Sequence, residues 1–191
     1  MSLTVRSRQK THPVDAWLLR RLAKWVLEIT EPDTAKRPSG HELGVFLVGP
    51  EEMARINFSS LQHEGPTDVI TFDYCEQGDE PKPGPILGDL FICPTVAEEF
   101  AGEFGTTWPE EVARYLIHGV LHLRGYDDRD AATRKAMKRE ENRLMEEAKN
   151  CFPLSPLAKR LITGVGGVRR KKPSSGGGGG IFSPGWPSCC R

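Results

Sequence analysis

Two histidines, a glycine and a carboxylate follow one another at short spacing in the segment HGVLHLRGYDD, residues 118–128. His118 and His122 are four residues apart, slightly more than one helical turn, so both side chains project from one face of a helix. Gly125 can adopt the left-handed conformation that ends a helix, so that the chain turns back and brings Asp127 or Asp128 towards the imidazoles. The pattern HxxxHxxGxxD therefore predicts three protein ligands and an open position, the arrangement of a catalytic zinc.

Each of these residues also has an ordinary structural interpretation. A histidine on a mostly apolar helix is usually a packed core residue, and Gly125 could be a plain helix stop. Asp127, Asp128 or Asp130 could cap the helix that follows. Core packing gives no reason, however, for two histidines, a helix breaker and a carboxylate to occur together at these offsets. We therefore favour the metal site.

The same spacing occurs in the metzincin peptidases. There, HExxHxxGxxH (or D) binds zinc, and the glutamate is the general base. Gly119 occupies the position of that glutamate in this chain. A peptidase of that design would lack the group that deprotonates its water, so a metallopeptidase is the less favoured hypothesis.

The rest of the chain must build the scaffold that positions this segment. Alternating, β-branched and aromatic residues predict strands, whereas helical spacing of apolar residues with Pro or Gly at the ends predicts helices. The expected strands are residues 2–9, 42–49, 68–74 and 86–93. The first helix is expected to begin near Thr11 and Pro13, and the later helices are expected at 50–57, 95–104, 107–123 and 129–149. These elements predict a single α+β domain with a mixed sheet of about four strands packed with four to five helices, and a zincin-like metal site at a helix end.

The apolar spacing also predicts which residues lie together on one face of a helix and which are buried. Val96, Phe100 and Phe104 lie on one face of the helix 95–104, and Gly105 is expected to end it. The apolar residues of the first and last helices are Val14, Leu18, Leu22, Trp25, Val26 and Ile29, and Met137, Leu144, Met145 and Ala148.

The bulk properties indicate a globular, cytoplasmic protein. The 191 residues, 38% hydrophobic and 27% charged, suit about one domain. No apolar run approaches the roughly 18 residues of a membrane span, and the start MSLTVRSRQKTHP lacks the apolar core of a secretion signal. Five cysteines without a CxxC pair predict reduced thiols, and Cys189 and Cys190 are too close together for a chelating pair.

The C-terminal part differs in composition. The domain is expected to span residues 1–160, whereas residues 164–191, rich in Gly, Ser and Pro, are expected to form a disordered basic tail. This tail holds five of the 26 basic residues and no acid, which leaves the rest of the chain acidic. Contacts with nucleic acid would therefore need a local patch, a metal or the tail. The run RRKK (169–172) could touch RNA or ribosomes, but a solvated tail is the simpler interpretation.

The segment HGVLHLRGYDD closely resembles HGxLHLxGYDH, the signature of the YbeY family of bacterial ribosomal-RNA maturation factors. Upstream, GPTDVITFDY (65–74) resembles that family's PTDVLSF segment, and ILGDLFIC (86–93) resembles its LGDIxI strand, in the same order. The resemblance covers about residues 53–149, while the first third of the chain matches only in layout.

The resemblance implies a metal-dependent hydrolase with one Zn²⁺ per chain. The family is described as a single-strand-specific endoribonuclease that acts in the maturation of small-subunit ribosomal RNA and in ribosome quality control. Single-stranded or ribosomal RNA and the ribosome are therefore the expected partners. His118 and His122 carry over as zinc ligands, and Asp128 falls where the family motif has its third histidine. The three would act in catalysis through the water that the metal binds.

Two positions depart from the family pattern. Asp128 replaces a histidine; a carboxylate binds zinc at about the same distance but adds a negative charge, which makes the bound water less acidic and favours harder metals such as manganese. Leu61 stands where the family usually has an arginine suited to a phosphate, with His63 close by as a partial substitute. The missing arginine favours a second hypothesis, a ribosome-associated binding factor whose zinc is mainly structural.

Five further polar residues are weaker candidates for the functional site. Thr67 and Asp68 could end a loop near the metal or merely start a strand, and Asp89 is expected to satisfy backbone donors instead of taking part in catalysis. Arg114 and Arg124 could lie near the rim of a cleft as phosphate contacts, although exposed arginines on helices are usually only solvated.

Overall fold

Four strands form one mixed sheet in the order β1-β2-β4-β3. The structure, a computed structural model, describes residues 1–31, 40–75 and 85–158. The strands are β1 (Ser2–Ser7), β2 (Glu42–Leu47), β3 (Val69–Asp73) and β4 (Leu87–Ile92). β1, β2 and β4 run parallel, whereas β3 pairs antiparallel with β4 at one edge. The N-terminal strand, predicted at residues 2–9, is thus an edge strand of the sheet.

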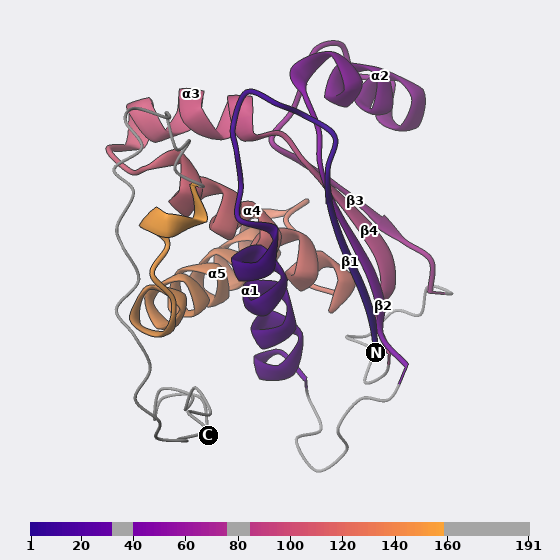
Figure 1. Ribbon diagram of the computed structural model, residues 1–191. Helices are drawn as coiled ribbons and strands as arrows, with labels where there is room; N and C mark the ends of the chain where they lie inside the picture. Colours follow the sequence, from indigo (N-terminus) through magenta and orange to yellow (C-terminus); the bar gives the residue numbers. More distant parts are fainter. Residues whose placement is uncertain (32–39, 76–84, 159–191) are drawn as a thin grey trace, which may run out of the picture.

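Five helices pack around this sheet. They are α1 (Ala16–Ile29), α2 (Pro50–Leu61), α3 (Pro94–Phe104), α4 (Trp108–Leu123) and α5 (Ala131–Cys151), followed by the 3-10 turn η1 (Ser155–Leu157). Figure 1 shows α1, α4 and α5 on one side of the sheet and α2 beyond one end of it. This arrangement confirms the predicted α+β domain with a four-stranded mixed sheet. Among the described helices, none combines the length and apolar character that crossing a membrane requires.

The predicted start of the first helix was wrong. The helix begins at Ala16, and the side chain of Asp15 accepts hydrogen bonds from the backbone N–H groups of Trp17 (2.9 Å) and Leu18 (3.0 Å). Asp15 is therefore the N-cap, because it satisfies two donors that the first turn leaves unpaired. Val14 precedes the helix and forms a bridge with Ala158. The segment 164–191, with the RRKK run and both adjacent cysteines, lies outside the described residues.

The core lies between the sheet and the helices, and α4 runs through its middle. α4 contributes more buried residues than any other described helix, and it contacts β3, β4, α1, α3 and α5. The apolar residues expected to be buried on α1 and α5 are indeed buried, except for the half-buried Ile29: Leu18, Leu22, Trp25, Val26, Met137, Leu144, Met145 and Ala148. The position of α4 therefore depends on packing from every side.

Two glycines let α4 lie close against the sheet. A Cβ atom on Gly88 of β4 would lie 2.5 Å from the backbone oxygen of Phe72 and 2.7 Å from a methyl group of Leu123. A Cβ atom on Gly119 of α4 would lie 2.6 Å from a methyl group of the fully buried Leu90. These distances are shorter than any relaxed contact, so larger residues would push the helix and the sheet apart.

Gly88→Ala should therefore destabilise the protein. Overpacking of a dense core costs about 1–3 kcal/mol, and here the obstacle is partly backbone. At roughly 2–4 °C per kcal/mol for a domain of this size, the melting temperature should fall by several degrees. Differential scanning calorimetry measures the change.

Gly102→Ala is the matched control, because a Cβ atom on this exposed α3 residue meets nothing within 4 Å. This substitution should raise stability by about 0.5–1 kcal/mol, since alanine favours helix. Equal melting temperatures for the two variants would contradict the close approach of α4 and β4.

Candidate metal centre

Both predicted histidine ligands lie on the last two turns of α4. The helix is stabilised at its start by Glu110, which accepts a hydrogen bond from the backbone N–H of Thr107 (2.9 Å). It ends in a left-handed Gly125 (φ 85°), as the sequence predicts. The N–H of Gly125 donates to the carbonyl of His122 (2.9 Å), and the N–H of Tyr126 donates to that of Leu121 (3.0 Å). This Schellman turn sends the chain back over the helix end.

The two imidazoles face each other. Their Nε2 atoms are 3.0 Å apart, and their ring centroids are 4.7 Å apart. Ligand atoms of His118, His122 and Asp128 all lie within 4.8 Å of one another. The structure therefore brings together the three side chains that the sequence predicts as ligands.

The hydrogen-bond partner of each Nδ1 atom shows that this nitrogen carries a proton. Nδ1 of His122 lies 3.1 Å from the carbonyl oxygen of Tyr126, which can only accept, so Nδ1 must carry the hydrogen. Nδ1 of His118 lies 3.0 Å from Oε2 of Glu141 and donates to that carboxylate in the same way. Burial lowers the pKa of His122, and the neighbouring His118 acts in the same direction, so this ring is neutral near pH 7.

This arrangement fits a cation. A ring that carries its single proton on Nδ1 presents a lone pair at Nε2, so two such Nε2 atoms 3.0 Å apart suit a positive ion that both can bind. The carboxylate of Asp128 adds a negative ligand on the same side. Two imidazoles and one carboxylate form a donor set that suits zinc and leaves one tetrahedral position open.

The neighbouring acids have other roles. Asp127 accepts a hydrogen bond from the backbone N–H of Asp128 (2.8 Å) and bonds to the side chain of Arg129. Asp130 is the N-cap of α5 and accepts from the backbone N–H groups of Ala132 (2.8 Å) and Thr133 (3.0 Å). Asp130 therefore follows the capping interpretation, while Asp128 alone of the three joins the histidines.

Glu141 is a residue of the candidate site that the sequence interpretation missed. Its carboxylate is 3% exposed and accepts hydrogen bonds from His118 (3.0 Å), Arg114 (2.7 Å) and Lys138 (2.8 Å). Burial opposes its ionisation, but these three donors outweigh burial and lower the pKa of Glu141 to about 2. A signal existed: Glu141 is a carboxylate within the apolar stripe of α5 that includes Met137 and Leu144.

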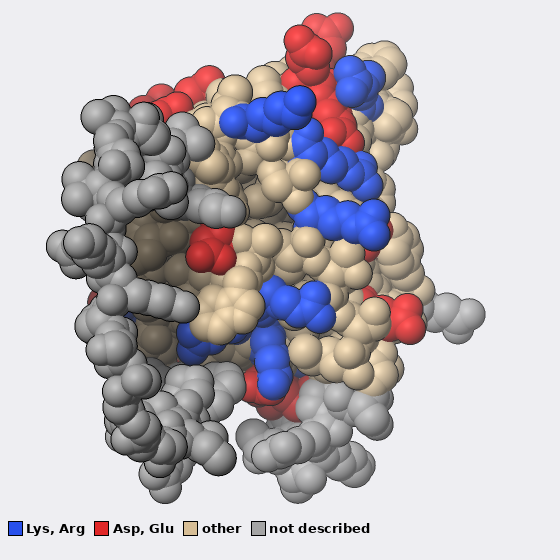
Figure 2. All heavy atoms as spheres, in the orientation of Figure 1, with Lys and Arg blue, Asp and Glu red and all other residues tan. Residues whose placement is uncertain are grey.

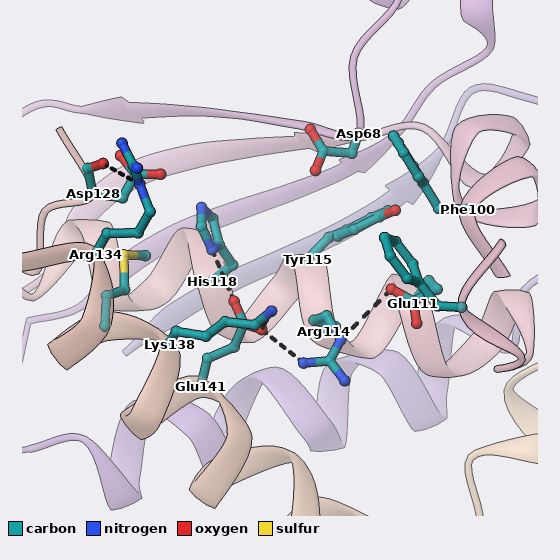
Figure 3. A pocket seen from close by; sticks show the side chains of 12 residues that line it. Asp68, Phe100, Glu111, Arg114, Tyr115, His118, Asp128, Arg134, Lys138 and Glu141 are labelled. Atoms are coloured by element: carbon teal, nitrogen blue, oxygen red, sulfur yellow. Dashed lines mark hydrogen bonds and ion pairs between the residues drawn. The ribbon is translucent and has the colours of Figure 1, made fainter. Parts of the chain in front are cut away.

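A pocket of about 300 Å³ opens beside His118 and Asp128 (Figure 3). One wall is a polar line along α4, whose members recur every three or four residues. The lining residues are Asp68, Phe100, Phe104, Glu111, Arg114, Tyr115, His118, Asp128, Arg134, Met137, Lys138 and Glu141. Tyr115 stays protonated, because burial and then the nearby Asp68 raise its pKa. Glu111 and Tyr115 were also missed, although both lie on the histidine face of α4 in the sequence.

Asp68 combines its two predicted roles. It is the residue before β3, and it lines the pocket with its carboxylate near Tyr115 and His118 in Figure 3. Its Oδ1 accepts hydrogen bonds from Thr67 and from the backbone N–H of Val69, both at 2.9 Å. These bonds and the strand that follows hold the carboxylate in place.

Both expectations for Arg124 were wrong, and Asp89 has a different hydrogen-bond donor from the one expected. Arg124 is 3% exposed and binds the carbonyl of Leu27 (3.1 Å) and the carboxylate of Glu31 (2.9 Å), so it ties the end of α4 to α1. Asp89, which does not line the pocket, accepts a hydrogen bond from the hydroxyl of Tyr74 (3.0 Å).

Of the remaining positions singled out in the sequence, Arg114 lines the pocket, whereas Leu61, His63 and Gly119 do not. Arg114 lines the pocket as expected, but its guanidinium is engaged by Glu141. Leu61 is exposed at the end of α2, and His63 follows it in an exposed segment; neither lines the pocket. Gly119 faces the sheet, so the peptidase glutamate would have no room at its position.

A basic patch lies over β1 and α1, apart from the pocket. Figure 2 shows Lys and Arg side chains following one another over this face. The first 24 residues contain a single acid, Asp15, and six basic residues: Arg6, Arg8, Lys10, Arg20, Arg21 and Lys24. The acidic balance of residues 1–163 therefore hides a local patch of the kind that contact with phosphate would need.

Known proteins resemble this chain in sequence and in fold. The family model described as Endoribonuclease YbeY matches residues 4–149. The endoribonuclease YbeY of Mycolicibacterium smegmatis is 35% identical over 153 residues, which are 77% of this chain and 83% of that protein. That of Bacteroides thetaiotaomicron is 38% identical over 104 residues, 54% of this chain and 72% of that protein. That of Mycobacterium ulcerans is 41% identical over 114 residues, 56% of this chain and 64% of that protein.

A solved structure agrees with the fold. The solution structure of TM1509 from Thermotoga maritima has a TM-score of 0.55 and 26% sequence identity, and the match covers 85% of this chain and 99% of that one. Fold and site together define a single α+β domain with a candidate metal centre of two histidines and a carboxylate at a helix end. The chain belongs to the YbeY family.

Removal of either histidine should abolish stoichiometric metal binding. We expect about one zinc per chain in the wild type, because each imidazole contributes one of only three protein ligands. His118→Ala and His122→Ala should lose most of this zinc, and Asp128→Ala should weaken binding. Asp128→His should keep or strengthen it, since an imidazole restores a ligand at a similar distance. Mass spectrometry of the metal content measures all four, and complete loss of zinc in Asp128→His would refute the assignment of the third ligand.

Glu141→Gln should lower zinc affinity by about 10- to 100-fold, because the carboxylate orients His118 and increases its basicity. Competition with a chromophoric chelator measures the change. Glu140→Gln is the matched control, since Glu140 is the adjacent residue and bonds to Arg143. Equal zinc affinity in the two variants would mean that Glu141 only supports the fold.

Proposed function

We propose that this protein is a zinc-dependent, single-strand-specific endoribonuclease that acts in the cytoplasm on ribosomal RNA, in small-subunit RNA maturation and ribosome quality control. The observation that carries the proposal is the convergence of His118, His122 and Asp128 beside a pocket of about 300 Å³. Membership of a family named for endoribonuclease activity supports the reaction and the substrate class.

The chain's own residues would hold the metal and orient its ligands. His118, His122 and Asp128 would bind it, while Glu141 and the carbonyl of Tyr126 keep both imidazoles in the tautomer with Nε2 free. A zinc ion held there would activate a water molecule and stabilise the charge that develops on the phosphodiester in the transition state. The pocket beside it has room for the nucleotide that reacts.

Arg134 is the pocket cation best placed to bind the scissile phosphate. Arg114 pairs with Glu111 and Glu141, and Lys138 pairs with Glu141, so the two positive charges face two carboxylates and are largely compensated. Arg134 instead donates to the backbone carbonyls of Asp128 (3.0 Å) and Arg129 (3.4 Å), and within the described ranges it has no ion pair with an acid. Its guanidinium could therefore replace the arginine whose family position is taken by Leu61, since arginine donates paired hydrogen bonds to phosphate.

The basic patch on β1 and α1 supports contact with a larger RNA. Such a patch binds phosphates regardless of sequence and weakens with salt, which suits ribosomal RNA as a partner. The patch lies apart from the pocket-lining residues, so it would bind a distant part of the ribosomal RNA and not the strand that is cut.

A binding factor with mainly structural zinc is the second candidate. The exposed Leu61 in place of the family arginine and the engagement of Arg114 by Glu141 favour it. The three-ligand site, with one position open, favours the enzyme. A metallopeptidase is disfavoured because Gly119 packs against Leu90.

Cleavage of a labelled single-stranded ribosomal RNA fragment tests the proposal. The zinc-loaded protein should cut it, whereas chelator or His118→Ala should abolish the reaction, and casein should stay intact. Arg134→Gln should keep its zinc but cut about tenfold more slowly or worse, because a charge-assisted contact with the phosphate is lost. Lys135→Gln, one position along α5 and outside the pocket lining, is the control and should cut normally.

Two results would overturn the assignment. Zinc-loaded protein that binds ribosomes tightly but leaves the RNA intact would support the binding factor. Cleavage that persists in His118→Ala would point to a contaminating nuclease.

A further inference from the structure

Two exposed phenylalanines lie at the pocket of the metal centre. Phe100 and Phe104 occupy successive turns of α3, four residues apart, and both line the pocket. Their rings are nearly parallel, with an interplanar angle of 14° and centroids 5.9 Å apart. Phe104 is 68% exposed and Phe100 is 36% exposed.

These rings do little for the core. The same face of α3 begins with Val96, which is 5% exposed and packs in the interior. The face then runs outward, so Phe100 and Phe104 extend it beyond the core and over the pocket rim. A phenylalanine that leaves two thirds of its surface in water gains little from folding, which makes a binding role the better explanation.

The pair is placed relative to the metal ligands by the helix–helix packing. α3 packs along α4, and Figure 3 shows Phe100 beyond Tyr115, at the far end of the pocket from Asp128 and Arg134, with His118 between them. A chain bound across the pocket would therefore meet Arg134, then His118, and then the two rings. Arg134 thus lies at one end of the pocket and the ring of Phe100 at the other.

We propose that Phe100 and Phe104 form a stacking platform for an unpaired base of the RNA strand, one or a few nucleotides from the bond that is cut. The proposal rests on the proposed function for its choice of RNA as the ligand. Every base has a π-face, so the platform accepts any sequence. A base inside a duplex is already stacked and paired on both sides, and exposing it costs several kcal/mol. The platform therefore selects single strands and is the source of single-strand specificity.

The guanidinium of Arg134 favours RNA over a purely apolar ligand. Arg134 lies in the same lining as the rings and donates to backbone carbonyls, so the pocket combines a cationic group for the RNA backbone with flat groups for the bases. An apolar peptide or lipid would use the rings but would offer no anionic group to Arg134.

Binding of a single-stranded oligoribonucleotide that contains one 2-aminopurine tests the platform. Stacking on an aromatic ring changes the fluorescence of this base, and anisotropy of an end label gives the affinity; both are read in chelator, so that no cleavage interferes. Phe104→Leu should remove the stacking signal and weaken binding by at least about fivefold. Phe104→Trp should retain both, because it restores a flat ring.

Phe58→Leu is the matched control. Phe58 is 56% exposed on α2 and does not line the pocket, so its replacement should leave both signals unchanged. The Phe104 substitutions should also leave zinc content and melting temperature unchanged, since the side chain contributes little to the core. A duplex with the same label should give a much smaller stacking signal with the wild type.

The outcomes separate this inference from the proposed function. If wild type cuts RNA in a chelator-sensitive way but Phe104→Leu binds and stacks like Phe58→Leu, the platform is refuted and the nuclease stands. If stacking depends on Phe104 but no RNA is cut, the platform stands and the nuclease fails. If the wild type binds no single-stranded RNA, both are refuted.

Discussion

Two imidazoles with their Nε2 atoms 3.0 Å apart are the constraint on which the candidate site depends. The carbonyl of Tyr126 and the carboxylate of Glu141 accept hydrogen bonds from the Nδ1 atoms of His122 and His118, which leaves both Nε2 atoms to face the site. A cation can bind both Nε2 atoms, and Asp128 supplies a third ligand on the same side. The tautomers, which the outer contacts determine, thus turn a pair of histidines into a candidate metal site.

The scaffold holds these groups by packing more than by polar contacts at the site itself. α4 lies close to the sheet because Gly88 and Gly119 leave room for it, and its end is tied to α1 by the buried Arg124. α5 brings Glu141 against His118 and Arg134 against the loop of Asp128. The same packing sets α3 beside α4, which is why aromatic rings and metal ligands share one pocket.

The sequence predicts what local geometry determines. The helical spacing of the histidines and the left-handed Gly125 follow from a few adjacent residues, and the structure confirms both. Glu141 lies 23 positions from His118, so only its place in an apolar stripe could indicate a buried role. Arg124 binds residues 93 to 97 positions away, which no local pattern reveals. The first helix begins at Ala16, later than the predicted entry near Thr11 and Pro13, because Asp15 caps its first turn.

The position of zinc in a crystal of the loaded protein tests the central claim most directly. An anomalous difference map at the zinc edge should show one peak within the roughly 2.0–2.2 Å that zinc keeps from nitrogen and carboxylate ligands, bonded to Nε2 of His118, Nε2 of His122 and an oxygen of Asp128, with the fourth position open. A peak at the cysteines, or a fourth side chain that closes the coordination, would contradict the account.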